Sequence, residues 1–189
     1  MAMKTVLIPL LILLVAGCQQ ASTPSDQVFS DAVYLGNVSS VYRIGALGDA
    51  PAPTDFSWRD SSGVVHSLSE YKGHDVLLNF WATWCGYCVA EMPALQDISR
   101  DSTAVVIGVS TDNAGNTFRT VQDFIRGNKI SYQIVIDSSQ SLYIDYIAQS
   151  GGTSGIPETY VIGKDGTIKF LLIGQQSEQS FRYRIALAN

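Results

Sequence analysis

Cysteine and charge are both scarce in this sequence of 189 residues. Three cysteines are too few for a small scaffold held together by disulfides. Charged residues make up 15% of the chain, with 12 Lys and Arg against 17 Asp and Glu, which gives a net charge of −5. The basic residues are scattered singly, so the sequence lacks the clustered Lys and Arg that bind nucleic-acid phosphates or anionic lipids. We therefore expect no nucleic-acid partner.

What the chain does have is the composition of a globular protein. Hydrophobic residues account for 46% and aromatic residues for 10%, enough to fill a sizeable core. This composition excludes a disordered or collagen-like chain. The length is typical of one domain, and no internal repeat is visible.

The N-terminus has the pattern of a signal peptide. Met1–Lys4 is a short basic start, and Val6–Ala16 is an apolar run too short to span a hydrocarbon layer of ~30 Å. The segment Val15–Cys18 reads VAGC, which resembles the lipobox of bacterial lipoproteins. An ordinary signal peptide with an incidental cysteine and an uncleaved anchor are the alternatives.

The resemblance to lipoproteins implies that residues 1–17 are removed and that Cys18 carries the lipid. The protein is then extracytoplasmic and lipid-anchored to a bacterial membrane, in a compartment where disulfides persist. Gln19 after the lipidated cysteine implies the outer membrane, facing the periplasm, if the host is Gram-negative. Residues 18–52 are expected to form a tether and an N-terminal extension, and residues 53–189 the main domain.

Hydrophobic patterning predicts an α/β domain. Val76–Trp81 and Val105–Val109 are nearly continuous apolar runs, typical of strands covered on both faces, and Glu91–Arg100 between them has helical spacing. Strand, helix and strand within about 30 residues form a βαβ unit, and hence a parallel pair of strands. The other expected elements are one or two strands over 28–44, a hairpin over 56–58 and 64–66, a turn or short helix over 68–72, helices over 118–126, 141–149 and 181–187, and strands over 134–136, 160–162 and 168–173.

Two cysteines lie where the first buried strand runs into the first helix. The segment Trp84–Cys88 reads WCGYC, and a C-x-x-C pair at a helix start can form a small disulfide ring. The partial positive charge of a helix N-terminus favours thiolate over thiol. Cys85 lies at the exposed end and Cys88 one turn further in. We therefore expect Cys85 to attack a substrate disulfide and Cys88 to resolve the mixed disulfide that forms.

Two other interpretations of this cysteine pair are open. It could supply half of a zinc site, but tetrahedral zinc takes four ligands, and the remaining candidates are Cys18, His66 and His74. It could be a purely structural disulfide, but the loop that it closes is too short to stabilise a fold much. We expect no metal and no cofactor, only a redox-active disulfide between Cys85 and Cys88.

Two segments of the chain resemble the TlpA/ResA/DsbE group of thioredoxin-fold proteins. Asn79–Cys88 reads NFWATWCGYC and is followed by the residues EMP at 91–93, and Gly155–Ile162 reads GIPETYVI. The resemblance covers residues 53–174. It implies a thioredoxin-like fold of the α/β class, with a central mixed β-sheet flanked by helices, an N-terminal β-hairpin extension and a helix insertion.

The resemblance also implies roles for residues around the cysteines. Pro157 is expected to follow a cis peptide bond and to face the pair, which leaves the backbone of Ile156 free to pair with an extended substrate strand. A trans proline that begins a strand is the alternative. Trp84 is expected to flank the exposed sulfur and to contact substrates, whereas Trp81 suits the core equally well.

Glu91 lies three residues after Cys88, on the same face of the expected helix. In the TlpA/ResA/DsbE group this glutamate is buried and helps proton transfer at the inner cysteine, because desolvation raises its pKa into a useful range. The alternative is an exposed glutamate that complements the helix dipole. Asn79, which cannot titrate, stands where ordinary thioredoxins carry a buried aspartate. Glu158 is expected only to decorate the loop after Pro157.

The expected activity is that of a thiol:disulfide oxidoreductase. By resemblance, it reduces disulfide-bonded protein substrates with electrons from a membrane thiol-disulfide donor, and cytochrome c maturation is one task of the group. Tyr87 replaces the proline common in the group's dipeptide, which leaves the redox potential open. A disulfide-forming oxidase, a peroxiredoxin-like peroxidase and a non-catalytic thioredoxin-fold binding module are the alternatives.

Overall fold

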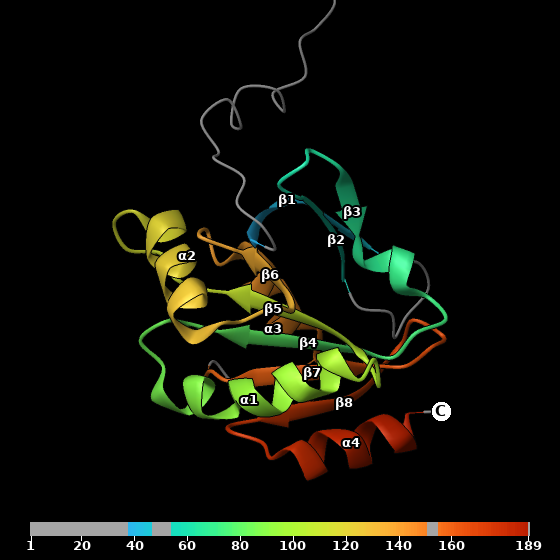
Figure 1. Cartoon of the computed structure of the whole chain (residues 1–189). Helices are drawn as coiled ribbons and strands as arrows, with labels where there is room; N and C mark the ends of the chain where they lie inside the picture. Colours follow the sequence, from blue (N-terminus) through green and yellow to red (C-terminus); the bar gives the residue numbers. More distant parts are fainter. Residues whose placement is uncertain (1–37, 47–53, 151–154, 189) are drawn as a thin grey trace, which may run out of the picture. The chain divides into compact units, whose positions relative to one another are not determined.

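The structure, a computed structural model, describes residues 38–46, 54–150 and 155–188. The expected signal peptide and the lipid on Cys18 lie outside these residues. In chain order the elements are β1 (Val38–Ala46), β2 (Thr54–Arg59), β3 (Val65–Ser67), the 3-10 helix η1 (Leu68–Tyr71), β4 (Val76–Trp81), α1 (Gly86–Arg100), β5 (Val105–Ser110), α2 (Thr117–Asn128), β6 (Gln133–Ile136), α3 (Ser141–Ser150), β7 (Glu158–Ile162), β8 (Ile168–Ile173) and α4 (Glu178–Leu187) (Figure 1). None of the helices described is long and apolar enough to cross a membrane.

The strands form one mixed sheet in the order β3-β2-β1-β6-β5-β4-β7-β8. The four inner strands β1, β6, β5 and β4 run parallel to one another. On one side β7 and β8 are added antiparallel, and on the other side β2 and β3 are added antiparallel. The predicted βαβ unit is present as β4, α1 and β5. The α/β class and the central mixed sheet are thereby confirmed.

Strand β4 determines which way the side chains of the site point. All six of its residues are buried, as the nearly continuous apolar run predicts. Leu77 and Trp81 pack into one hydrophobic cluster, and Leu78 and Phe80 pack into another. Since side chains alternate between the two faces of a strand, Asn79 faces the same side as Leu77 and Trp81.

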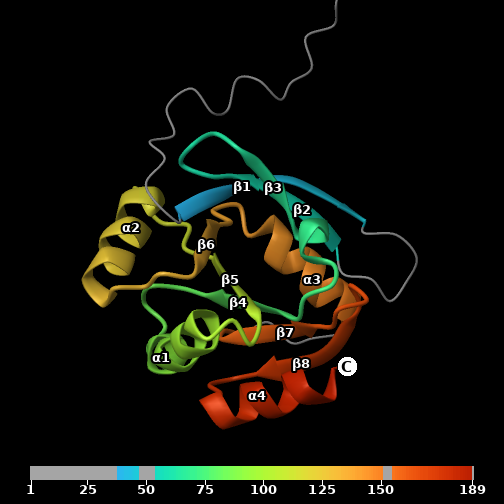
Figure 2. The same cartoon turned by 45° about the vertical axis from the view of Figure 1, so that its right-hand side comes forward.

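Helices cover both faces of the sheet. The face of Asn79 is covered by α1, α2 and α4, which contribute Leu95, Val121 and Phe181 to one cluster. The other face is covered by α3, with Tyr146 fully buried in the second cluster. In Figure 2, α1 and α4 lie on one side of β4 and β7, and α3 lies on the other. The chain therefore forms three layers, with the sheet in the middle.

The N-terminal extension continues the sheet. The predicted hairpin is present as β2 and β3, and the backbone N–H of Asp60 donates to the carbonyl of Val64 at 2.9 Å in its turn. Strand β1 lies between β2 and β6 and pairs with both. The division of the chain at residue 53 stays a prediction, and β1, which precedes it, is an inner strand of the sheet.

Helix α1 begins at Gly86, at the cysteine pair that the sequence places at a helix start and five residues before the helical spacing of Glu91–Arg100. Cys85 is the residue that caps this helix, because its Sγ accepts a hydrogen bond from the backbone N–H of Cys88 at 3.1 Å. The cap places the second cysteine in the first helical turn. Pro93 lies inside α1, within its second turn.

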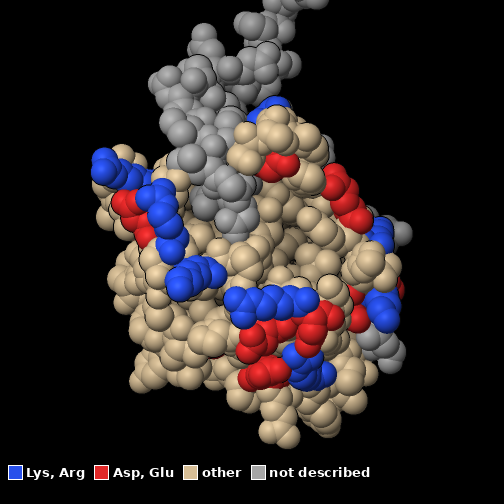
Figure 3. Space-filling model, viewed as in Figure 1, with Lys and Arg blue, Asp and Glu red and all other residues tan. Residues whose placement is uncertain are grey.

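Charged side chains of both signs are interspersed on the surface. On the face shown in Figure 3 they gather over α2 and over the region of α1 and α4. Arg182 of α4 is 2.8 Å from Glu178 on its own helix and 2.5 Å from Asp101, the residue that caps the end of α1. The pair with Asp101 joins the far end of the cysteine-bearing helix to α4.

Candidate active site

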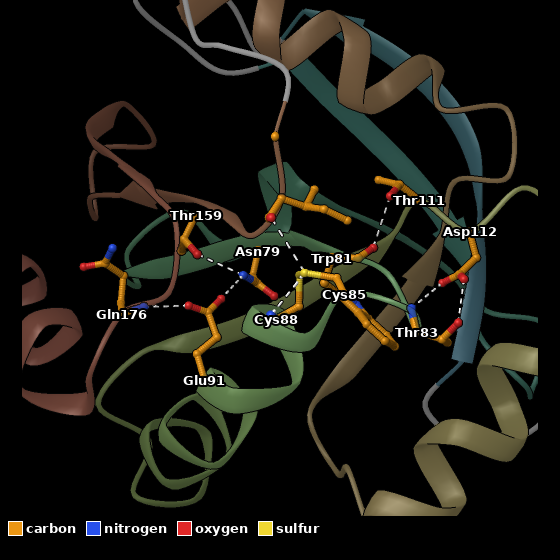
Figure 4. Close-up of a disulfide and its surroundings, with 12 residues drawn as sticks. Asn79, Trp81, Thr83, Cys85, Cys88, Glu91, Thr111, Asp112, Thr159 and Gln176 are labelled. Atoms are coloured by element: carbon orange, nitrogen blue, oxygen red, sulfur yellow. Dashed lines mark hydrogen bonds between the residues drawn. A yellow bond between two sulfur atoms is a disulfide. The ribbon is translucent and has the colours of Figure 1, made fainter.

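The two cysteines of the C-x-x-C motif lie where β4 gives way to α1 (Figure 4). Their sulfur atoms are bonded at 2.06 Å. The unpaired N–H groups at the start of α1 face this position, and together with the helix dipole they stabilise a thiolate there. The exposed fraction is 6% at Cys85 and 1% at Cys88. Cys85 is thus the outer sulfur and Cys88 the inner one, in the order that the sequence predicts.

A carboxylate that the sequence analysis missed holds the loop between β4 and Cys85. Asp112 follows β5 and is buried. It accepts two hydrogen bonds from Thr83, one from the backbone N–H at 2.9 Å and one from the hydroxyl at 2.7 Å. The hydroxyl of Ser110 donates a third bond at 2.8 Å. The signal was present in the sequence, because residues that follow parallel neighbouring strands meet at the same edge of a sheet.

Two aromatic rings are exposed beside the disulfide. Trp84 is 71% exposed and Tyr87 is 72% exposed, and they flank Cys85 in the chain. Large exposed rings next to a reactive sulfur provide apolar contact area for a protein substrate. Trp81, in contrast, is fully buried and packs against Phe124 with 5.4 Å between ring centroids. Its place is in the core.

The proline loop reaches the disulfide from the far end of the sequence. The peptide bond between Ile156 and Pro157 is cis, as predicted. The carbonyl oxygen of Ile156 lies 3.7 Å from the Sγ of Cys85 (Figure 4). Gly155, just before these two residues, is exposed. The backbone of this loop therefore lies beside the outer sulfur.

Glu91 lies on α1, three residues after Cys88, and is 1% exposed. One carboxylate oxygen accepts a hydrogen bond from the Nδ2 of Asn79 at 2.8 Å, and the other accepts one from the backbone N–H of Gln176 at 2.9 Å. Burial raises the pKa of Glu91 from 4.5 to about 7, although both hydrogen bonds oppose the rise. The alternative of an exposed glutamate at the helix start is therefore wrong.

The expectation that Glu158 only decorates the proline loop is also wrong. Glu158 is the first residue of β7 and is fully buried, because β7 pairs with β4 on one side and β8 on the other from this residue onward. Burial raises the pKa of its carboxyl, and the hydroxyl of Tyr160, which donates to it at 3.3 Å, lowers this pKa in part. Tyr160 belongs to the cluster under α3, on the opposite face from Glu91.

His66, considered above as a zinc ligand, has partners elsewhere. Its Nε2 is 3.1 Å from a carboxylate oxygen of Asp60, and its Nδ1 is 3.3 Å from one of Glu70. The bond to Asp60 is the main cause that raises the pKa of His66. Across the residues that the structure describes, no three His, Cys, Asp or Glu side chains are grouped so as to hold a metal ion.

Comparison with known proteins assigns the chain to a family. The sequence pattern of the AhpC/TSA family matches residues 49–171, more than half of the chain. The chain belongs to the AhpC/TSA family. Among the relatives of the chain, the thioredoxin-like protein YneN of Bacillus subtilis is 31% identical over 147 residues, which cover 77% of this chain and 82% of YneN. The thiol-disulfide oxidoreductase ResA of Geobacillus kaustophilus is 30% identical over 125 residues, which cover 66% of this chain and 69% of ResA.

Solved structures agree with this family assignment. StoA from Bacillus subtilis is 28% identical, with a TM-score of 0.58 over 71% of this chain and 98% of StoA. A thiol:disulfide interchange protein of the thioredoxin family from Chlorobium tepidum is 26% identical, with a TM-score of 0.62 over 75% of this chain and 99% of its own. The resemblance to the TlpA/ResA/DsbE group is thus confirmed. This AhpC/TSA-family chain has a thioredoxin-like fold and is a thiol-disulfide oxidoreductase.

Proposed function

We propose that this chain is an extracytoplasmic reductase of protein disulfides that works through Cys85 and Cys88. The observation that carries the proposal is the asymmetry of the pair. Cys85 lies beside the proline loop and the exposed ring of Trp84, whereas Cys88 is enclosed, one helical turn before the buried carboxyl of Glu91. An outer sulfur that attacks and an inner sulfur with its own proton acceptor are what thiol-disulfide exchange needs.

In the first step the thiolate of Cys85 attacks one sulfur of a substrate disulfide. A bond forms between Cys85 and that sulfur, and the second substrate sulfur leaves as a thiolate. The helix N-terminus stabilises the attacking thiolate. Trp84 contacts the substrate, and the backbone at Ile156 pairs with an extended substrate segment beside Pro157.

In the second step Cys88 releases the substrate. Its thiol gives a proton to the carboxylate of Glu91, and the resulting thiolate attacks the Sγ of Cys85. The Cys85–Cys88 disulfide forms, the mixed disulfide breaks, and the substrate leaves with two thiol groups and two more electrons. A carboxyl with a pKa of about 7 suits this step, because it accepts a proton near neutral pH and is not trapped by it.

The place of the reaction follows from the N-terminal sequence. A lipid on Cys18 would hold the protein at a bacterial membrane, on the periplasmic side of the outer membrane if the host is Gram-negative. A membrane thiol-disulfide donor would then return electrons to the cysteine pair. General reduction of disulfides in exported proteins fits an outer-membrane location better than cytochrome c maturation does, because cytochrome c is assembled at the inner membrane.

The direction of the reaction is tested by the equilibrium redox potential of the Cys85–Cys88 pair. The full-length protein in detergent is equilibrated against a series of dithiothreitol or glutathione buffers, and thiols are counted by alkylation. A potential near that of thioredoxin, about −270 mV, supports a reductase. A potential near about −120 mV overturns the proposed direction and favours a disulfide-forming oxidase. Turnover of peroxide without reduction of insulin would favour a peroxidase instead.

A further inference from the structure

Asn79 is the one polar residue of β4, a strand that is buried along its whole length. Its side chain is fully enclosed and faces α1. A carboxamide in such a position is unfavourable unless hydrogen bonds replace those that it made to water. The positions on either side of it on the same face of the strand are filled by Leu77 and Trp81, so an apolar residue would suit the packing of this face.

The amino group of Asn79 uses both of its hydrogens. Nδ2 donates to the carboxylate of Glu91 at 2.8 Å and to the hydroxyl of Thr159 at 2.9 Å. Thr159 lies opposite Asn79 in the β4–β7 register, two residues after Pro157. One carboxamide therefore joins the proton acceptor on α1 to the strand that leads out of the proline loop.

The oxygen of the same carboxamide has no hydrogen-bond donor within the described residues. Turning the amide over would not help, because Oδ1 would then face the carboxylate oxygen of Glu91. The ionised glutamate thus fixes the orientation of Asn79. Figure 4 shows the hydrogen bonds that join Asn79 to Glu91 on one side and to Thr159 on the other.

We propose that Asn79 is the positioning residue of the release step: its carboxamide N–H orients the carboxylate of Glu91, the proton acceptor for Cys88, and ties it to Thr159 in the strand that follows the proline loop. This proposal rests on the function proposed above. Asn79 itself gains and loses no proton. The proton passes from Cys88 to Glu91, and Thr159 keeps the carboxamide from turning.

The release step can be observed by itself. Reduced full-length protein in detergent reacts with 5,5′-dithiobis(2-nitrobenzoate), and one nitrothiobenzoate leaves when Cys85 attacks. A second leaves when Cys88 attacks the mixed disulfide. The rate of this second, unimolecular release is measured by stopped flow between pH 5 and pH 9. In the unaltered protein we expect the rate to rise through an inflection near the pKa of Glu91, about 7.

Asn79→Leu removes the donor to the ionised carboxylate of Glu91. We expect the inflection to move up by about one pH unit and the rate at pH 7 to fall about fivefold, because the ionised form of Glu91 loses a charge-assisted hydrogen bond. Gln96→Leu is the matched control. Gln96 is also a buried carboxamide, but it bonds to Ser131 and does not contact Glu91, so its loss should leave the pH profile unchanged.

Thr159→Val and Thr159→Ser cover the case in which Asn79→Leu does not fold. The valine variant lacks the hydroxyl that anchors the carboxamide and should shift the inflection upward by less than Asn79→Leu, whereas the serine variant should restore the original profile. The proposal is overturned if folded Asn79→Leu or Thr159→Val keeps the original profile, or if Gln96→Leu shifts it equally. Glu91→Gln separates the two proposals: if it keeps the inflection, the proposed function has the wrong proton acceptor, whatever Asn79 does.

Discussion

The raised pKa of Glu91 predicts how the stability of the fold depends on pH, and this prediction requires no knowledge of the substrate. Folding raises this pKa from 4.5 to about 7, so the folded protein binds a proton that the unfolded chain has already released. The stability that comes from the protonated carboxyl is complete below pH 4.5 and is lost as the pH rises through 7. A rise of about 2.5 pH units corresponds to about 3 kcal/mol at 1.36 kcal/mol per unit. Since Glu91 is 1% exposed, solvent screening does not reduce this figure much.

Glu91→Gln removes the titrating group but keeps its size. We expect the free energy of unfolding of the oxidised protein to fall by about 3 kcal/mol more between pH 4.5 and pH 8 in the original chain than in this variant. Urea titrations followed by circular dichroism at several pH values measure both. The difference between the two proteins cancels the other acids that titrate in this range. Asp97→Asn, an exposed change on the same helix, should follow the original chain.

The reasoning would be refuted by parallel curves, in which Glu91→Gln loses as much stability between pH 4.5 and pH 8 as the original protein. Such a result would mean that water reaches the carboxyl, or that the unfolded chain holds it in a similar setting. A difference of the opposite sign would mean that the bonds from Asn79 and Gln176 outweigh burial.

Three further changes have expected outcomes. Asp112→Ala removes the acceptor of both hydrogen bonds from Thr83 and should lower the free energy of unfolding by about 2 kcal/mol in a urea titration. Thr83→Val loses only the hydroxyl bond and should lower the free energy of unfolding by less in the same titration. Trp84→Ala should leave the melting temperature unchanged, because the ring is 71% exposed, but should slow insulin reduction about tenfold without slowing the reaction with a small disulfide. His66→Gln should lower the free energy of unfolding by less than about 1 kcal/mol at pH 5.5 and leave it unchanged at pH 8. A histidine with a raised pKa stabilises the fold below its unfolded pKa and loses this effect as the pH rises. Thermal unfolding at the two pH values measures the difference.

The elements that the sequence predicts well are those with a local signal. The apolar runs of β4 and β5 and the helix between them depend on patterns within a few residues, and the structure has all three. The cysteine pair is a local signal as well, because its spacing and its position at a helix start are both visible in the chain. Helical spacing alone begins only at Glu91, and it is the cysteine pair that marks where α1 starts, with Cys85 as its cap.

The parts that the sequence did not predict depend on pairing between distant segments. The place of β1 between β2 and β6 follows from the order of strands in the sheet, which no periodicity records. Glu158 lies inside because β7 begins one residue after Pro157, and a charged residue at that position has the pattern of a loop. The bonds of Asn79 and Asp112 join residues that are close only after the sheet has formed.

The surroundings of Glu91 are assembled late, from segments that are far apart in the chain. Gln176, which donates to the second carboxylate oxygen, comes 85 positions later in the chain, and the partner of Asn79 comes 80 positions later. A chain that emerges from its N-terminus presents both cysteines long before either contact can form. Until β7 and the segment after β8 have docked, the carboxyl stays in water with the pKa of an ordinary glutamate. Completion of the fold therefore raises this pKa to about 7, and a nascent chain carries its thiols with Glu91 still an ordinary acid.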